Sequence, residues 1–505
     1  MSLGPSLARG AVSLGGARII GNLLGAISIV ILARLLTPTD FGIVAIASSI
    51  LSIVQSCTEL SLANALIQKR DVQRSHIDTA WTMSLLRSLA LILVLAMLAW
   101  PLAEIYRMPN LIPVILVSGL TGAAAGLQNP LISLATKDMR FGPIAVSQLA
   151  QKALSFAFAV VLALMLRSYW AIIAGNALGA VLASLLTYFI VPYRPRFDLS
   201  RLREIWSFSG WLFLKQLCET LNWRADQLII GTLVSKPQLG VYAMADSLAV
   251  IPSRETLHPI RQALYPGLAI VNGNDERLRS STLRAQATLA MVVAPLGIML
   301  ALVAEPAIRI ALGDQWRQAV PFVQISALLY SFGCFSVGLQ PVAMAVGRTK
   351  ILFVLQAIVL LVKLPMLVAG FIVGGLLGTA LARCLVEFLA MMLELVAIRI
   401  LVGITVGKQI HAHAATIAGL VAMSVVVTQV HRVLAASQDN ALVQFGIEVI
   451  TGIAVYGATV LGLWLASGKR LGPVDELLHV AGRLLARFRP EAPQQSVAKS
   501  GAVGQ

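Results

Sequence analysis

Charge is scarce in this sequence. Of its 505 residues only 12% are charged whereas 58% are hydrophobic, and the mean hydropathy is +0.83. One globular core in water cannot bury that much apolar side chain, so the composition excludes a soluble protein. Apolar stretches of about 20 residues, the length that crosses a hydrocarbon core, recur between short polar breaks. The sequence therefore predicts an all-α integral membrane protein.

Cysteine is also scarce, and the chain lacks the usual spacings of metal and nucleotide sites. The four cysteines are scattered singly through apolar segments, at Cys57, Cys218, Cys334 and Cys384. His411 and His413 are two residues apart, so on a helix they point to different faces. The stretch GLWLASGKR, residues 462 to 470, misses the spacing of a phosphate-binding loop. We expect no metal, no cofactor and no direct use of ATP.

The apolar stretches predict about fourteen transmembrane helices. They cover residues 15–36, 41–63, 79–101, 111–136, 143–166, 170–191, 209–232, 238–267, 285–305, 319–343, 351–372, 375–400, 412–431 and 442–466. The first stretch is long and no small-residue cleavage site follows it, so we expect it to remain as a span.

The distribution of basic residues predicts the orientation of these spans. If the N-terminus is cytoplasmic, 24 of the 39 lysines and arginines fall on the cytoplasmic side, six on the other side and nine inside spans. Basic residues near membrane ends favour the cytoplasmic side, so this split predicts cytoplasmic N- and C-termini. The net charge of +16 then reflects topology, and we expect no nucleic-acid partner.

Three pairs of similar segments indicate an internal repeat. ARLLTPTDFGIVAIASSI (33–50) resembles GTLVSKPQLGVYAMADSL (231–248), GLQNPLISLATKDMRF (126–141) resembles GLQPVAMAVGRTKILF (338–353), and GNALGAVLAS from Gly175 resembles GTALARCLVE from Gly378. Each pair lies six spans apart, and six is even, so both copies enter the membrane in the same direction. Parallel repeats of this kind form the two rocking halves of some transporters. Chance similarity between glycine-rich membrane helices is the alternative.

The repeat predicts five parts of the chain. These are a six-helix lobe (1–191), a cytoplasmic linker with a short amphipathic helix (192–208), a second six-helix lobe (209–400), two additional transmembrane helices (401–466), and a cytoplasmic amphipathic helix with a disordered tail (467–505).

Ionisable residues inside the spans are the candidate functional groups, because a charge at mid-bilayer costs roughly 2.5–3.5 kcal/mol on insertion scales. The spans hold nine cations against seven carboxylates, which favours a positive cavity between the lobes and an anionic ligand. The candidates for substrate binding are Arg254, Arg261, Lys363, Lys152, Lys215, Arg87, Gln128 and Gln340, and those for ion coupling are Asp226, Glu255 and His258. Pairing within one helix, Lys215 with Glu219 and Arg383 with Glu387, is a structural alternative. For the two glutamines the structural alternative is to join helices.

Several segments in order resemble a known family. ARLLTPTDFG, ALIQKRD, FDLSRLREIWSFSGWLFLKQL and DQLIIGTLVSKPQLGVYAMA are similar to the polysaccharide-transporter branch of the multidrug, oligosaccharidyl-lipid and polysaccharide exporter superfamily. The resemblance covers roughly residues 1–430 and contains no catalytic signature. It implies a fourteen-helix, two-lobed protein of the bacterial inner membrane.

The resemblance implies a flippase for an undecaprenyl-pyrophosphate-linked oligosaccharide, used in exopolysaccharide, capsule or O-antigen synthesis. Membrane lipids are further expected partners, and a polysaccharide polymerase and a chain-length regulator are candidate protein partners. Two alternatives stay open. A drug exporter of the same superfamily should show unpaired carboxylates in its cavity, and a membrane glycosyltransferase or polymerase should carry a sizeable external loop.

Overall fold

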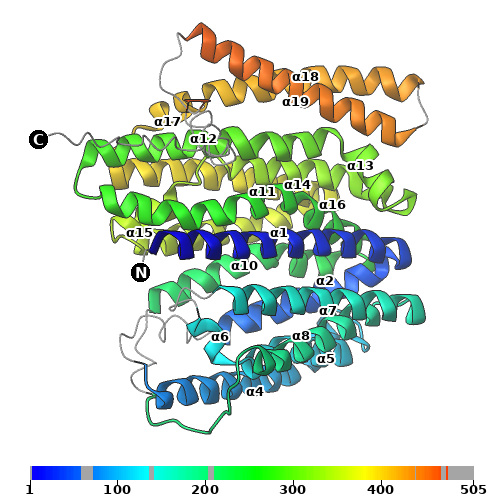
Figure 1. The fold of residues 1–505 in the computed structure, drawn as a ribbon. Helices are drawn as coiled ribbons and strands as arrows, with labels where there is room; N and C mark the ends of the chain where they lie inside the picture. Colours follow the sequence, from blue (N-terminus) through cyan, green and yellow to red (C-terminus); the bar gives the residue numbers. More distant parts are fainter. Residues whose placement is uncertain are drawn as a thin grey trace, which may run out of the picture.

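The structure of the protein is a computed structural model that describes residues 3–58, 72–135, 141–202, 210–437, 440–467 and 474–475. Side chains within these ranges are described except those of residues 3–14, 133, 210–213, 215, 254–263, 266 and 435–437. Every regular element in the described part of the chain is helical, as predicted. The helices run side by side along one common direction (Figure 1).

The first lobe occupies the lower half of Figure 1 and has α1 at its upper boundary. Its elements are α1 (Leu3–Leu35), α2 (Pro38–Thr58), α4 (Arg74–Ile105), α5 (Leu111–Ala123), the 3-10 turn η1 (Ala124–Leu127), α6 (Pro130–Leu134), α7 (Gly142–Leu166) and α8 (Trp170–Ile190).

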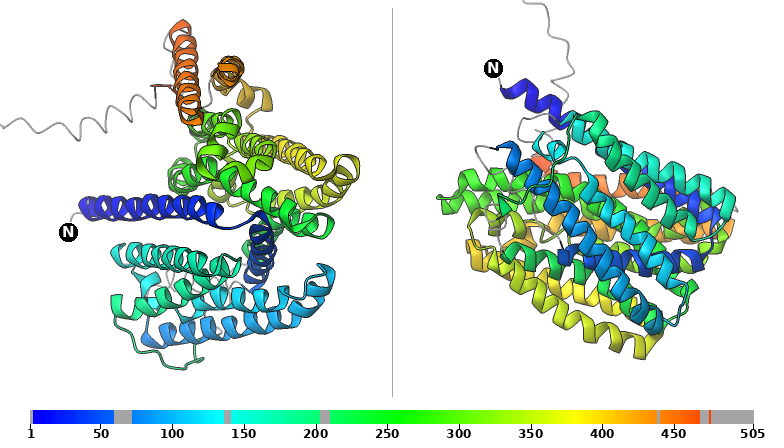
Figure 2. Two further views of the ribbon diagram at one scale, coloured as in Figure 1. Left: turned by 90° about the vertical axis from the view of Figure 1, so that its right-hand side faces the viewer. Right: turned by 90° about the horizontal axis from the view of Figure 1, so that it is seen from below.

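The second lobe lies above the first, and two further long helices lie beyond it (Figures 1 and 2). The lobe comprises α10 (Gly210–Leu233), α11 (Lys236–Val271), α12 (Asp275–Leu302), α13 (Ala304–Ala311), η2 (Asp314–Ala319), α14 (Val320–Phe332), α15 (Leu339–Ala345) and α16 (Lys350–Val402). The additional helices are α17 (Val406–Ala412), α18 (Ala414–Ser437) and α19 (Ala441–Ala466).

Helix α16 contains two of the predicted spans. Its backbone leaves the helical region at Gly374 and Gly375, and Gly375 has a φ of 58°, which glycine adopts without the strain of a Cβ atom. The chain therefore reverses between two arms. Near the reversal Gly370 and Gly378 face each other so closely that a Cβ atom on Gly378 would overlap the Gly370 carbonyl oxygen.

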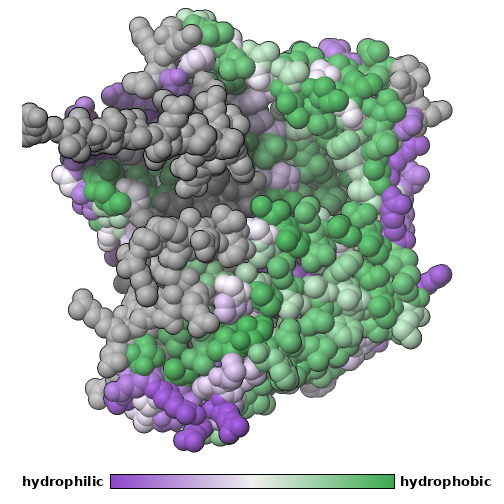
Figure 3. Space-filling view, viewed as in Figure 1, coloured by the Kyte–Doolittle hydropathy of each residue, from purple (hydrophilic) through white to green (hydrophobic). Residues whose placement is uncertain are grey.

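The surface is that of a membrane protein. Nine described helices are long and apolar enough to span a bilayer. Large hydrophobic side chains such as Met97, Phe189 and Ile372 are at least 74% exposed, and Figure 3 shows hydrophobic residues over the middle of one face with hydrophilic ones at the edges. The predicted total of fourteen spans stays a prediction, because spans four and ten are each broken into shorter helices, α5 with η1 and α14 with α15.

The first repeated segment is the start of a helix in each lobe. Thr37 caps the start of α2, and its N–H donates to Asp40 Oδ2 at 2.9 Å. Ser235 caps the start of α11, and its N–H donates to Gln238 Oε1 at 3.2 Å. Both are the reciprocal cap of the form Ser/Thr-x-x-acid/amide, with a proline in the first turn. The two sequences resemble each other because they start the same kind of helix at equivalent places.

The second repeated segment marks the break in the fourth helix of each lobe. Gly126 packs on α4, where a Cβ atom would overlap Ser88 Oγ, and Gly338 packs on α12, where a Cβ atom would lie 3.0 Å from Gln286 Cγ. The supporting helices α4 and α12 correspond to predicted spans three and nine, again six apart.

The third repeated segment packs in an equivalent way. Gly175 of α8 lies against the backbone of Ala159 on α7, and Gly378 of the second α16 arm lies against Gly370 on the first arm. The first match therefore starts corresponding helices and the other two pack against corresponding helices of the two lobes, which supports a true repeat over chance similarity. The exact boundaries of the five predicted parts remain predictions.

The described part of the predicted linker is not helical before its end. Residues 192–198 have no regular secondary structure, and Tyr193 donates to Asp78 Oδ1 at 2.6 Å, which ties the linker to the start of α4. Residues 203–206, half of the predicted amphipathic helix in 199–206, lie outside the described residues. The predicted C-terminal amphipathic helix and tail also lie outside them, apart from Val474 and Asp475.

Candidate functional site

The two lobes meet where the repeat-equivalent helices α2 and α11 cross. A Cβ atom on Gly42 would overlap the carbonyl oxygen of Lys236, and one on Gly240 would overlap the carbonyl oxygen of Pro38. In the repeat alignment Gly42 corresponds to Gly240 and Pro38 to Lys236, so each helix makes the same contact on the other. The crossing thus has approximate twofold symmetry, and only glycine allows the backbones to approach so closely. We call this contact the glycine crossing, and the end of the molecule that holds it the closed end.

Further contacts join the lobes at the closed end. The guanidinium of Arg34, at the end of α1, donates to the carbonyls of Ile310 and Ala311, at 2.5 and 3.1 Å. The indole of Trp316 in η2 donates to the carbonyl of Ala33 at 2.8 Å. Trp316 also belongs to one buried apolar cluster with side chains of α2 and α11. Apolar packing and charged contacts therefore hold this end together.

Farther along α2, polar side chains connect the lobes. Ser49 donates to Gln227 Oε1 on α10 at 2.8 Å, and the hydroxyls of Ser56 and Thr220 lie 2.6 Å apart. Hydrogen bonds between small polar groups hold helices together without filling the space between them. Helix α2 is therefore the main element of the first lobe that contacts the second.

A buried ion network lies inside the second lobe. Arg383 Nη1, on the second arm of α16, is 2.9 Å from Asp226 Oδ2 on α10 and 2.8 Å from Asp246 Oδ1 on α11. Tyr242 and Tyr330 donate to these two carboxylates at 3.0 and 2.6 Å. The side chains of the three ionic residues are at most 5% exposed. This burial is tolerable because each charge faces opposite charge and hydrogen-bond donors or acceptors.

Lys363, on the first arm of α16, has partners beside this network. Its ammonium donates to the carbonyl of Asn222 at 2.5 Å and lies 3.9 Å from Glu387 Oε1. Lys363 is 1% exposed, so in this structure it faces the interior of the second lobe rather than a water-filled gap between the lobes. The structural alternative of a pairing between Arg383 and Glu387 within one helix does not hold in this structure. Arg383 binds the two aspartates of neighbouring helices, and Glu387 lies beside Lys363.

The remaining predicted residues are distributed over both lobes. Lys152 on α7 is exposed and donates to Asn22 Oδ1 on α1 at 2.9 Å. Arg87 is half-buried on α4. Gln128 is exposed just after η1, and its repeat equivalent Gln340 is half-buried in α15, so both follow the helix break of their own lobe.

Five predicted residues have side chains outside the described part. These are Lys215 on α10 and Arg254, Glu255, His258 and Arg261 on α11. Their helices are placed, since α10 and α11 both contact α2 of the first lobe. The side-chain directions of these five residues stay predictions.

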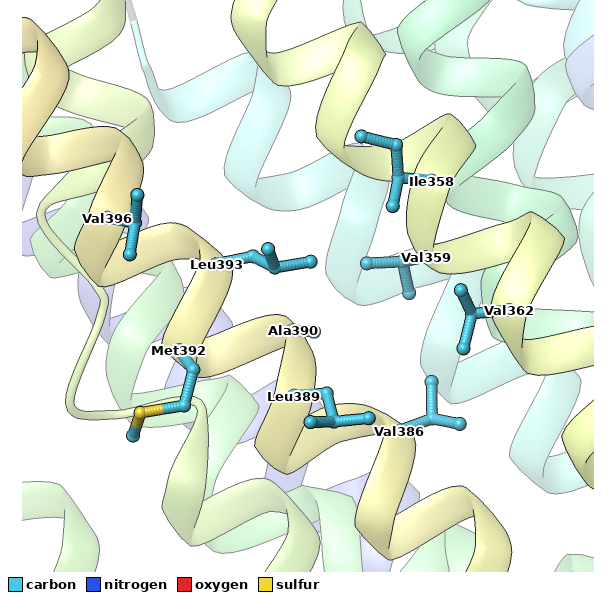
Figure 4. Close-up of a pocket in the computed structure, with 9 residues that line it drawn as sticks. All are labelled: Ile358, Val359, Val362, Val386, Leu389, Ala390, Met392, Leu393 and Val396. Carbon is cyan, nitrogen blue, oxygen red and sulfur yellow. The ribbon is translucent and has the colours of Figure 1, made fainter.

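An apolar crevice separates the two arms of α16. It has a volume of about 270 Å³ and is lined only by aliphatic side chains and Met392 (Figure 4). Ile358 and Val362 line it from the first arm, and Leu389 and Leu393 from the second. Without a polar group it cannot solvate a charged headgroup. It is therefore not the site of ion or headgroup chemistry.

Sequence reasoning missed Asp246, Tyr242 and Tyr330 as members of the ion network. The available signal was charge balance, because Arg383 on one span needs carboxylates from others and Asp226 and Asp246 stand on adjacent spans. Their separation from Arg383 by 157 and 137 residues left the pairing undetermined.

Two lobes that cross through equivalent helices, with ionic groups buried inside one of them, define a multi-pass membrane transporter fold. Solved structures agree. The lipid II flippase MurJ, in its inward closed conformation, matches with a TM-score of 0.73 and 14% identity over 90% of this chain and 99% of that one. An inward-facing multidrug transporter of the MATE family, in the MOP superfamily, matches with a TM-score of 0.57 and 14% identity over 78% and 98%.

The sequence places the protein within this class. A family model described as polysaccharide biosynthesis protein matches residues 31–321, and the chain belongs to that family. The succinoglycan biosynthesis transport protein ExoT of Rhizobium meliloti is 24% identical over 65% of this chain and 67% of its own. The lipopolysaccharide biosynthesis protein WzxC of Escherichia coli is 22% identical over 69% and 71%. Family and fold are those of transporters rather than enzymes.

Proposed function

We propose that the protein translocates an undecaprenyl-pyrophosphate-linked oligosaccharide across the bacterial inner membrane by alternating access. The translocated oligosaccharide serves the synthesis of an exopolysaccharide, a capsule or O-antigen. The glycine crossing supports this proposal most directly, because it is an inter-lobe contact made of small residues in a family of polysaccharide biosynthesis proteins. Such a contact can separate and re-form without leaving large side chains unpacked.

In this proposal the closed end faces the periplasm and both termini face the cytoplasm. The positive-inside split supports this orientation, because the segments at the closed end carry few basic residues. The described state would then be shut on the side where the substrate leaves. Rocking of the lobes about their contact would open that side and close the cytoplasmic one.

Cations and amides between the lobes would replace the hydration of the pyrophosphate and the sugars, while the polyprenyl tail stays in lipid. Arg254 and Arg261 are the main candidates, since α11 lies at the lobe contact. Lys215, Lys152, Arg87, Gln128 and Gln340 would contribute from the neighbouring helices. Lys363 would act through the ion network in the state described here and reach the substrate only in another state.

Asp226 links this network to a driving ion in the proposal. Its carboxylate is held by Arg383, so a proton or small cation that binds Asp226 would weaken that ion pair and change the packing of α10 against α16. Glu255 and His258 on α11 are the other candidates for coupling. Either route would make the position of the second lobe depend on an ion gradient.

The proposal is tested with the full-length protein in proteoliposomes that contain a fluorescent lipid-linked oligosaccharide. We expect a rate of headgroup movement above that of protein-free vesicles, and we expect Arg254→Ala to reduce it while Arg254→Lys retains part of it. Arg432→Ala is the matched control, because it removes one exposed cation from α18. Equal rates for R254A and the unaltered protein would overturn the assigned substrate role of Arg254. Absence of movement with the unaltered protein would overturn the proposed function.

A further inference from the structure

A second polar feature lies at the closed end and shares no residue with the ion network. It is a cavity of about 600 Å³ that opens between the lobes. From the first lobe it is lined by Thr39 of α2 and by residues 105–108 at the end of α4. From the second lobe it is lined by Gly231, Thr232 and residues 234–237, at the end of α10 and the start of α11. A ligand in this cavity would touch both lobes at once. We call it the seam cavity.

The seam cavity is positively charged. Arg107 and Lys236 line it from opposite lobes, and no carboxylate is among its lining residues. Neither cation forms a salt bridge within the described residues. The nearby cations of the second lobe differ in this respect, because Arg309 lies 3.7 Å from Asp314 and Arg317 lies 3.1 Å from Glu305. The two cations of the seam cavity therefore have positive charge available for an anion.

The backbone adds to this positive potential. Lys236 is the first residue of the 36-residue helix α11, whose first turn contains no acidic residue. The N-terminal end of a helix carries partial positive charge, so a lysine there is electrostatically unfavourable unless an anion is nearby. The hydroxyl of Thr39 also lines the cavity and can donate a hydrogen bond to such an anion. The hydroxyls of Thr232 and Ser235 line it too, but they donate to the Ile229 carbonyl at 2.8 Å and to Gln238 Oε1 at 3.0 Å.

Arg107 has a backbone conformation that is less strained for glycine than for other residues. Its φ is 51°, in the left-handed region, directly after α4, and Met108 N–H donates to the Ala103 carbonyl at 2.8 Å to close the helix end. Glycine usually occupies this position, because other residues there are strained. Arg167 has the same conformation after α7, with a φ of 46°, but does not line the cavity. The pair provides a matched comparison for the role of the guanidinium.

We propose that the seam cavity binds a phosphate group and that this binding holds the closed end shut. Two cations with the Thr39 hydroxyl suit a compact tetrahedral anion with many acceptor oxygens. The phosphate can belong to a lipid headgroup of the surrounding leaflet or to a free phosphate compound. A ligand that binds only the closed state shifts the equilibrium toward it. One consequence rests on the proposed function, in which the closed end faces the periplasm. Phosphate bound on the periplasmic side would then slow the opening of the closed end.

The experiment measures opening of the closed end in the full-length protein. Cysteines at the exposed positions Asn110 and Gln318, one in each lobe, carry spin labels on a background without the four native cysteines. The protein is placed in nanodiscs of phosphatidylcholine with increasing inorganic phosphate, at ionic strength held constant with sodium chloride. A second series replaces part of the lipid by phosphatidylglycerol without added phosphate. The readout is the fraction of molecules in which the distance between the two spin labels is short.

We expect this fraction to rise and saturate in at least one series. A response to phosphate alone identifies a free anion as the ligand, and a response to phosphatidylglycerol alone identifies a lipid headgroup. Arg107→Gly should raise the half-saturating concentration about tenfold, because one charge-assisted hydrogen-bond partner is lost while the backbone conformation is favoured. Lys236→Gln should have a similar effect, and Arg167→Gly should leave the response unchanged.

No response in either series, or an equal response of R107G and the unaltered protein, would overturn the proposal. The measurement contains no oligosaccharide, so its outcome is independent of whether the proposed substrate is correct. Failure of the flipping assay would leave a phosphate response intact, and failure of the phosphate response would leave flipping intact.

Discussion

Gly42 and Gly240 occupy equivalent positions in the two halves of the sequence and contact each other across the lobes. Gly240 approaches the carbonyl of Pro38, in the helix that holds Gly42. Gly42 approaches the carbonyl of Lys236, in the helix that holds Gly240. An internal sequence similarity has thus become a symmetric contact in space. A side chain at either position meets backbone, which cannot move away as a flexible side chain would.

Gly240→Ala should therefore disfavour the closed state. Overpacking a tight contact costs about 1–3 kcal/mol, and this cost falls only on the state in which α2 and α11 cross closely. Spin-label distances between Asn110 and Gln318 should lengthen in G240A, and transport should slow. Gly457→Ala is the control, because a Cβ atom on Gly457 of α19 would have no neighbour within 4 Å. An unchanged distance distribution in G240A would contradict a role of the crossing in closure.

The ion network should be important for stability. Arg383→Met leaves Asp226 and Asp246 buried without their cation, and breaking a buried pair costs about 3–5 kcal/mol. Thermal unfolding of the purified protein in detergent should show a large loss of stability. Arg317→Met is the matched control, since the ion pair with Glu305 is exposed, with 76% and 45% of the side-chain surfaces accessible, and should contribute less than about 1 kcal/mol. Similar losses in the two variants would refute the importance of the network.

The orientation can be tested by thiol labelling in intact cells. A cysteine at Ser200, in the exposed part of the linker, should resist a reagent that does not cross the inner membrane, whereas one at Gln318 should react. Both should react after the membrane is permeabilised. Labelling of S200C in intact cells would contradict the proposed orientation and would indicate that the closed end faces the cytoplasm.

Local sequence patterns were sufficient for the helices and the repeat. Apolar runs of membrane length report helices directly, and Thr37 with Asp40 and Ser235 with Gln238 are start signals readable without a structure. Contacts between helices needed the structure. The spacing on one helix suggested that Arg383 pairs with Glu387. Arg383 instead faces neighbouring helices, and it forms ion pairs with their carboxylates, Asp226 and Asp246.

Lys363 shows the same limit. An isolated lysine in an apolar span indicates a partner or a polar cavity without distinguishing between them. The structure provides Glu387 and the carbonyl of Asn222. The seam cavity was equally hidden, because Arg107 and Lys236 are ordinary loop cations in the sequence and come together only when the lobes meet.

Alternating access by the two lobes is tested most directly by a reversible clamp at the closed end. Cysteines at Arg34 and Ala311, whose contact joins α1 to α13 in this structure, are linked by a short reducible thiol crosslinker in proteoliposomes that contain a fluorescent lipid-linked oligosaccharide. The single variant R34C, treated in the same way, is the control. The account predicts that headgroup movement falls to the level of protein-free vesicles when the pair is linked and recovers when the link is reduced. Continued movement in fully crosslinked protein would contradict it.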